Sequence, residues 1–300
     1  MTADRRAQLA ANLDEVRGRI ARACSAAGRD PSSVTLVAVT KTYPASDVEL
    51  LASLGVTDVA ENKDQEAAAK AAAVSAPLRW HFVGRLQRNK ATSVIRYADV
   101  VESVDSLRLV AALSKASVAG RRSPLEVLIQ ISLDGDPARG GAIASTGSAP
   151  GDPSLTDSWP GGGSSRTPGS LPSAAGESLS VASVPSVPGS SPSAHASASI
   201  DISGFSDSMN PERDLWRVAA AADAADGLRL AGVMAVAPRG WDPDAAFVIL
   251  AGLARRLRVH YPDATVISAG MSGDLEAALR QGATHVRIGT SLLGMRNTLR

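Results

Sequence analysis

The chain has 300 residues, of which 44% are apolar and 20% charged, a balance typical of a globular protein with a sizeable core. Lysine and arginine (31) nearly cancel aspartate and glutamate (30), so a net charge of +1 excludes a general electrostatic attraction to nucleic acid or anionic membrane. Cys24 is the single cysteine and the four histidines have no cysteine beside them, which excludes an internal disulfide and a zinc-type ligand pattern.

Apolar residues at helical spacing open the chain. Leu9, Leu13, Val16 and Ile20 recur every three or four residues, which predicts the buried face of a helix over about residues 3–27. The charged residues at the N-terminus do not resemble a signal peptide, and no apolar stretch is long enough to span a membrane. We therefore expect a cytoplasmic protein in a reducing compartment, with no membrane partner.

Short segments rich in apolar and β-branched residues alternate with helical segments along the chain. They are 34–40, 58–61, 80–83, 100–104, 127–133, 228–236, 265–269 and 285–288. Strands separated by helices form right-handed parallel crossovers, and for this set a single α/β domain, a closed (β/α)8 TIM barrel over 1–300, is the economical arrangement. An open doubly wound sheet is the alternative, but no glycine-rich dinucleotide motif follows the first strand.

Residues 145–209 interrupt this alternation. Serine, proline, glycine and alanine dominate the segment, which has few charges and little apolar clustering. Such a composition buries too little surface to offset the entropy of ordering. We predict a low-complexity, disordered insertion after the fifth strand, where the entropy of loop closure grows only slowly with length.

Lys41 directly follows the first predicted strand, at the end of the barrel where active sites lie. A lysine in this position is often a snorkelling surface residue. Its amine can instead attack an aldehyde and form an imine. The position of Lys41 alone does not decide between a surface lysine and an imine-forming lysine. The surrounding motifs are needed for that decision.

Two loops near the C-terminus have the composition of an anion site. Ser272 and Gly273 precede a predicted helix at 275–280, and Gly289 and Thr290 lie where the last strand passes into another helix. Backbone amides at helix N-termini bind phosphate, and the last two loops of such barrels often do so. Each loop alone is equally well explained by Ser272 or Thr290 capping its own helix, but the pair favours phosphate.

Further polar residues are placed at the same end of the barrel by the strands that carry them. Arg287 should point inward from the last strand, where a buried guanidinium needs a partner or a ligand. Asn62 and His81 lie at the ends of the second and third strands, although a core histidine held by hydrogen bonds is more common than a catalytic base. Arg85, Arg88 and Lys90 form a basic cluster without interleaved aromatics, which favours a solvated helix face over nucleic-acid binding.

Several of these segments together resemble a known family. They are 37–44 (VAVTKTYP), 61–66 (ENKDQE), 80–90 (WHFVGRLQRNK), 268–274 (SAGMSGD) and 285–290 (HVRIGT). In this order they are similar to the YggS/PROSC family of pyridoxal phosphate homeostasis proteins. The likeness covers about residues 3–142 and 211–294, outside the insertion.

The resemblance implies a barrel like the N-terminal domain of alanine racemase, with pyridoxal 5′-phosphate (PLP) held as a Schiff base on Lys41. Met234 resembles a family methionine beside the cofactor, although a core methionine explains it equally well. Arg287 resembles the racemase arginine that faces the pyridine nitrogen, where a cation weakens the electron sink. The expected cofactor residues are Lys41, Asn62, His81, Met234, Ser272, Gly273, Arg287, Gly289 and Thr290.

The function implied by the resemblance is that of a carrier and regulator of intracellular PLP (vitamin B6) and amino-acid pools, without catalytic residues or metal. Alanine racemase needs a second domain with a tyrosine acid, for which we expect no room before Arg300. Lys63 stands where the family usually has an aromatic residue. We expect a monomer that delivers PLP to apo-enzymes. The alternatives are a PLP-dependent racemase or lyase, and a barrel for another phosphorylated metabolite.

Overall fold

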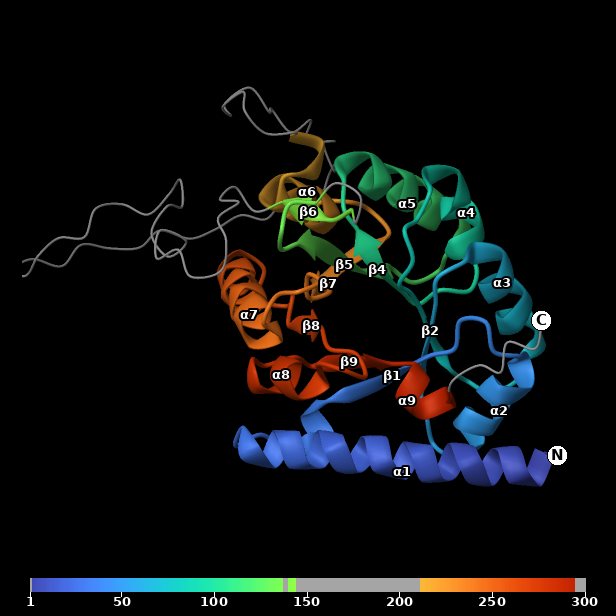
Figure 1. Cartoon of the computed structure of the whole chain (residues 1–300). Helices are drawn as coiled ribbons and strands as arrows, with labels where there is room; N and C mark the ends of the chain where they lie inside the picture. Colours follow the sequence, from blue (N-terminus) through green and yellow to red (C-terminus); the bar gives the residue numbers. More distant parts are fainter. Residues whose placement is uncertain (1, 137–139, 144–210, 295–300) are drawn as a thin grey trace, which may run out of the picture. The chain divides into compact units, whose positions relative to one another are not determined.

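The protein folds into a closed barrel of parallel strands. The structure, a computed structural model, describes residues 2–136, 140–143 and 211–294. Within these residues the ring runs β1–β2–β3–β4–β5–β7–β8–β9 and closes through the pairing of β9 with β1. Figure 1 looks into this ring, with helices around its outside. The predicted (β/α)8 barrel is therefore confirmed, and the open doubly wound sheet is wrong.

The elements alternate along the chain as strand and helix. The strands are β1 (Thr35–Val39), β2 (Asp58–Glu61), β3 (Arg79–Phe82), β4 (Val100–Val104), β5 (Leu125–Ser132), β6 (Ala142–Ile143), β7 (Leu228–Met234), β8 (Val266–Ser268) and β9 (His285–Ile288). The α-helices are α1 (Thr2–Ala26), α2 (Ala45–Ser53), α3 (Asp64–Ala73), α4 (Ala91–Val94), α5 (Leu107–Gly120), α6 (Leu215–Asp223), α7 (Pro243–His260), α8 (Leu275–Arg280) and α9 (Thr290–Leu293). Short 3₁₀ turns are η1 (Pro31–Ser33), η2 (Arg88–Lys90) and η4 (Pro211–Arg213).

Every predicted strand is found, although the observed strand ends differ from the predicted ones by a few residues. Strand β6 was not predicted; it pairs in parallel with the end of β5 through Ile131 and Ala142, outside the closed ring. The predicted insertion at 145–209 lies outside the described residues. No helix in the described part of the chain is long and apolar enough to cross a membrane.

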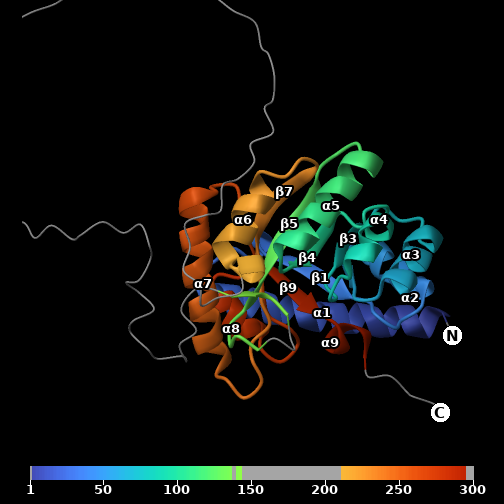
Figure 2. The same cartoon turned by 90° about the horizontal axis from the view of Figure 1, so that it is seen from above.

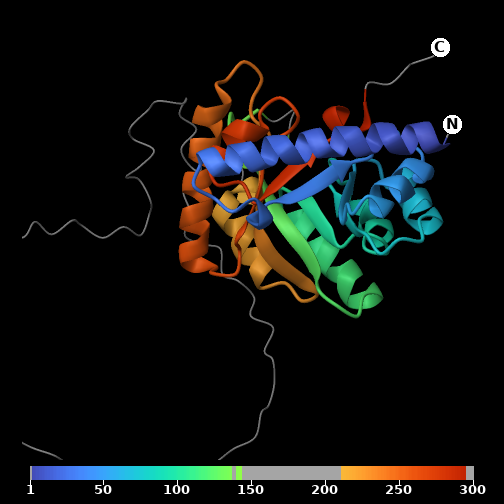
Figure 3. The same ribbon diagram turned by 90° about the horizontal axis from the view of Figure 1, so that it is seen from below.

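Helix α1 covers the outside of the barrel beside β1 and β9. Leu9, Leu13, Val16 and Ile20 are all buried there, in one apolar cluster with Leu279 of α8, so the predicted helix face is confirmed. Figures 2 and 3 show α1 running across this side of the barrel, next to α8 and α9. Because α9 has a single turn, α1 supplies the apolar cover that a longer last helix would give.

The barrel interior has an apolar layer and a polar layer. Met234 packs with Val100, Leu128 and Ala231 in the apolar one. Gly232 on β7 has φ +152° and lies so close to β8 that an added Cβ would overlap the backbone of Val266. Glycine is therefore required at this position in β7.

Candidate functional site

Neighbouring strands place Lys41, Asn62 and Gly289 at one sector of the barrel mouth. Lys41 and Asn62 follow β1 and β2, whose residues Val39 and Ala60 are paired. Gly289 follows β9 on the other side of β1, and a Cβ added to it would lie 3.5 Å from the carbonyl oxygen of Val39. Three residues that are distant in sequence are thus brought to adjoining strand ends.

The two predicted anion loops lie against each other. The backbone N–H of Ser291 donates a hydrogen bond of 3.3 Å to Oγ of Ser272, which joins the loop before α8 to the first turn of α9. The N-cap residues are Asp274 for α8 and Gly289 for α9, and neither helix has a side-chain cap bond. The alternative in which Ser272 or Thr290 caps its own helix is therefore wrong.

Helix α1 holds the loop before α8 from outside the barrel. Arg19 donates from Nη2 to the carbonyl oxygen of Ser272 at 3.0 Å and pairs with the carboxylate of Glu276 at 2.8 and 2.9 Å. The hydrogen bond to Glu276 raises the pKa of Arg19. Gly273 in the same loop is exposed, with open space where a Cβ would point. Sequence reasoning missed Arg19, which no local pattern connects to this loop.

The backbone just before Lys41 is fixed by a buried ion pair. Lys70 donates to Oε1 of Glu61 at 2.5 Å and to the carbonyl oxygen of Thr40 at 2.7 Å, while Oγ1 of Thr40 donates to the same carboxylate at 2.7 Å. Thr42 then turns the chain with φ +75°, a conformation that β-branched residues rarely adopt. The Lys41 side chain itself is exposed. Lys41 is thus exposed between the fixed end of β1 and a constrained turn.

A chain of charged side chains crosses the barrel interior beneath the mouth. The ring of His81 contacts Oδ1 of Asp58 at 3.0 Å and Oε1 of Glu102 at 2.7 Å. The other oxygen of Glu102 accepts a hydrogen bond of 2.6 Å from Oγ of Ser268. Arg287 donates to the same Oγ at 2.6 Å and lies 3.6 Å from Glu102. All five residues are buried.

The buried groups hold one another in their charged forms. Burial disfavours the charge on His81, but hydrogen bonds to Asp58 and Glu102 outweigh it and raise the pKa of His81 to about 9. Burial likewise opposes ionisation of Glu102, yet His81 and Arg287 lower its pKa to about 2. Burial lowers the pKa of Arg287, which Glu102 partly offsets. Burial and the charge on His81 lower the pKa of neighbouring His285 to about 4.

The remaining predicted site residues fall at different depths. Arg287 does point into the barrel, where Nη2 also donates to the carbonyl oxygen of Ala235 at 2.9 Å. His81 and Met234 lie inside the barrel as well, with 2% and 3% exposure. Asn62 is half-buried, and its Oδ1 has no hydrogen-bond partner among the described residues. That any of these residues contacts a cofactor stays a prediction.

A cavity of about 840 Å³ opens in another sector of the mouth, where β3, β4 and β5 end. None of the predicted cofactor residues lines it. Arg85 and Arg88 do line it, and they lie in a loop and in η2. Both side chains are exposed, so the predicted solvated face is confirmed, whereas the predicted helix is not found at Arg85. No cluster of His, Cys, Asp or Glu that could hold a metal ion occurs among the described residues.

Known proteins resemble this chain in both sequence and structure, although no protein-family model matches it. It is 36% identical to the pyridoxal phosphate homeostasis protein of Mycobacterium tuberculosis H37Rv over 98% of this chain and 95% of that relative. PipY of Synechococcus elongatus PCC7942, solved without PLP, is 25% identical with a TM-score of 0.62, covering 96% of this chain and all of PipY. Alanine racemase of Corynebacterium glutamicum, at 13% identity, has a TM-score of 0.53, covering 96% of this chain and 63% of the racemase. This last likeness shows the alanine racemase barrel fold.

Proposed function

The chain belongs to the family of pyridoxal phosphate homeostasis proteins, and we propose that it binds PLP through Lys41 and takes part in balancing intracellular PLP and amino-acid pools. The observation that supports this site most is the contact between Ser291 and Ser272, which joins the loop before α8 to the segment after β9, the neighbour of the strand that Lys41 follows. A structure of PipY with PLP bound has the same fold, with a TM-score of 0.61.

The residues at the mouth fit a phosphorylated aldehyde. Ser272, Gly273, Gly289 and Thr290 offer hydroxyls and backbone amides to the phosphate. The buried Oδ1 of Asn62, without a partner among the described residues, is an acceptor for a donor on the ligand. When bound, the cofactor supplies an aldehyde carbon, to which the Lys41 amine bonds while the aldehyde oxygen leaves as water.

The interior network favours a carrier over an enzyme. Both ring nitrogens of His81 are bonded to carboxylates and its pKa is raised to about 9, so at neutral pH it is charged and a poor base. Arg287 is held as a cation, and a cation beside the ring nitrogen disfavours the protonated pyridine that amino-acid chemistry uses. We infer that the protein stores PLP reversibly and passes it to apo-enzymes.

The absorbance spectrum of the purified protein tests the cofactor and its attachment together. We expect an imine band that survives desalting, and that borohydride reduction converts into a stable mass increase on the peptide containing Lys41. The Lys41→Ala variant should lose both signals. Lys115→Ala, at an exposed position on α5, is the matched control and should keep them. An unchanged band in Lys41→Ala would overturn the proposal.

Proton exchange separates a carrier from a racemase or lyase. Amino acids incubated with the loaded protein in deuterated water should keep their α-protons, as seen by NMR. Exchange that depends on Lys41 would instead show an enzyme. Phosphate-ligand binding without any imine band would favour the remaining alternative, a barrel for another phosphorylated metabolite.

A further inference from the structure

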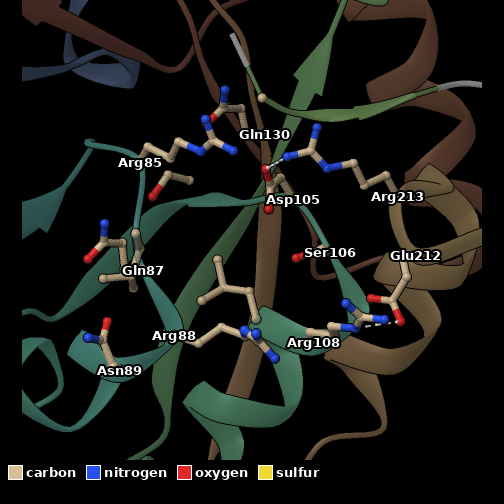
Figure 4. A pocket seen from close by; sticks show the side chains of 14 residues that line it. Arg85, Gln87, Arg88, Asn89, Asp105, Ser106, Arg108, Gln130, Glu212 and Arg213 are labelled. Carbon is tan, nitrogen blue, oxygen red and sulfur yellow. Dashed lines mark hydrogen bonds and ion pairs between the residues drawn. The ribbon is translucent and has the colours of Figure 1, made fainter. Parts of the chain in front are cut away.

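The cavity at the ends of β3, β4 and β5 has the size and polarity of a small-molecule site. Its volume of about 840 Å³ falls within the roughly 300–1,000 Å³ of typical ligand pockets. Figure 4 shows Arg85 and Arg213 approaching its middle from opposite sides, with Asp105 and Gln130 between them. Arg88 enters from the wall that carries Arg85. Cationic side chains thus surround the space.

The charges lining the cavity do not cancel. Arg213 pairs with Asp105 at 2.8 Å, and Arg108 pairs with Glu212 at 3.3 Å. The other two lining arginines, on the segment after β3, make no hydrogen bond or ion pair with any described residue. Among the described lining residues, arginines therefore outnumber carboxylates by two. Guanidinium groups bind phosphate and carboxylate oxygens through paired N–H donors.

A buried hydroxyl without a partner belongs to one of the lining residues. Ser103, at the end of β4, is 2% exposed and lines the cavity, and its Oγ has no hydrogen-bond partner among the described residues. Buried polar atoms without a partner are uncommon, because losing water without replacement is unfavourable. Asp105 and Glu212, although paired with arginines, keep acceptor capacity for hydroxyl groups. The lining therefore suits a ligand with both an anionic head and hydroxyls.

We propose that this cavity binds a small phosphorylated polyhydroxyl metabolite, with its phosphate on Arg85 and Arg88. A phosphate monoester carries close to two negative charges at neutral pH, which matches the excess of two arginines. A monocarboxylate would leave one of them uncompensated. The Oγ of Ser103 donates to the ligand, and the hydroxyls of the ligand donate to Asp105 and Glu212.

This site is separate from the one proposed for PLP. Its lining residues come from β4, β5, η4 and the segments that follow β3, β4 and β5, whereas Lys41, Asn62, Ser272 and Gly289 follow β1, β2, β8 and β9. The two sites share no residue. Each can therefore be loaded and tested while the other is monitored.

Calorimetric titration of the full-length protein with glycerol 3-phosphate tests the cavity. The protein is first loaded with PLP, so that the loops near Ser272 are occupied, and the imine band reports this loading. We expect binding that weakens at least tenfold in the double variant Arg85→Gln, Arg88→Gln. Arg96→Gln, an exposed arginine of the same segment outside the cavity, is the matched control and should bind like the parent.

The Ser103→Ala variant is a second test of ligand binding. The Oγ of Ser103 has no hydrogen-bond partner among the described residues, so the substitution removes no hydrogen bond within the protein. We expect an affinity loss of about three- to tenfold with an unchanged unfolding midpoint. Glycerol should not bind, and inorganic phosphate should bind more weakly than the ester. Absence of binding at about 10 mM ester, or equal binding by the double variant and Arg96→Gln, would overturn the proposal.

The remaining outcomes test the chemical class of the ligand and separate this cavity from the site proposed for PLP. Succinate binding as tightly as glycerol 3-phosphate would overturn the assignment to phosphate. If the imine band is absent but the ester still binds in an Arg85- and Arg88-dependent manner, this cavity stands while the PLP proposal fails.

Discussion

Replacing His81 with glutamine should remove a pH dependence of stability that the barrel interior creates. In the folded protein the imidazolium lies between Asp58 and Glu102, at 3.0 and 2.7 Å, with 2% of the residue exposed. Its pKa rises from 6.5 to about 9 on folding, a difference that corresponds to about 3 kcal/mol. Because the folded pKa is the higher one, this stabilisation is complete below pH 6.5 and is lost as the pH rises through 9.

Denaturant unfolding between pH 6 and pH 9.5 measures this loss. In a Lys41→Ala background, which removes any contribution from the cofactor link, the free energy of unfolding should fall by about 3 kcal/mol over this range. His81→Gln should be less stable at pH 6 by about 3 to 5 kcal/mol, because two buried carboxylates lose their cation, and should show little further loss up to pH 9.5. His260→Gln, at an exposed position on α7, is the matched control. An equal alkaline loss in His81→Gln and in the control would refute the reasoning.

Three further substitutions probe the barrel and its mouth. Gly232→Ala should destabilise the fold by about 3 kcal/mol or more, measured by thermal unfolding, because its Cβ would overlap the backbone of Val266. Lys70→Met should cost about 3 to 5 kcal/mol in denaturant unfolding by leaving the carboxylate of Glu61 buried without a cation, whereas an unchanged midpoint would contradict the ion pair. Arg19→Gln should weaken PLP binding several-fold in a spectral titration, because α1 would no longer hold the loop before α8, and an unchanged affinity would contradict that role.

The sequence was sufficient where a feature depends on neighbouring residues. Lys41 stands directly after an apolar β-branched run, and Ser272 and Gly289 lie at strand-to-helix junctions. In a parallel barrel such positions lie at one end of the strands, so the strand pattern alone predicted that these residues belong to the same end of the barrel. The joining bond between Ser291 and Ser272 then follows from the neighbouring positions of β8 and β9.

Features that depend on contacts between distant segments could not be predicted in this way. Glu102 lies in Val-Val-Glu-Ser-Val, a pattern that predicts a buried strand and nothing more. Its partners His81 and Ser268 are determined by the register of other strands. Arg19 reaches Ser272 across 253 residues of sequence. Arg85 was assigned to a helix face because a charge pattern cannot distinguish a helix from the loop that follows β3.

The charges inside the barrel add up to zero at neutral pH, and this balance bears on how Arg287 is presented. Asp58 and Glu102 contribute two negative charges, and His81 and Arg287 two positive ones. Replacing buried ion pairs with apolar residues often stabilises a protein, so stability alone gives no reason for this network. The network does, however, fix the position of a side chain. The guanidinium of Arg287 is held by Ser268, by the carbonyl oxygen of Ala235 directly after β7 and by Glu102. The barrel thus fixes the position of this cation before any ligand arrives, and a ring bound at the mouth would meet an electrostatic environment set by the protein.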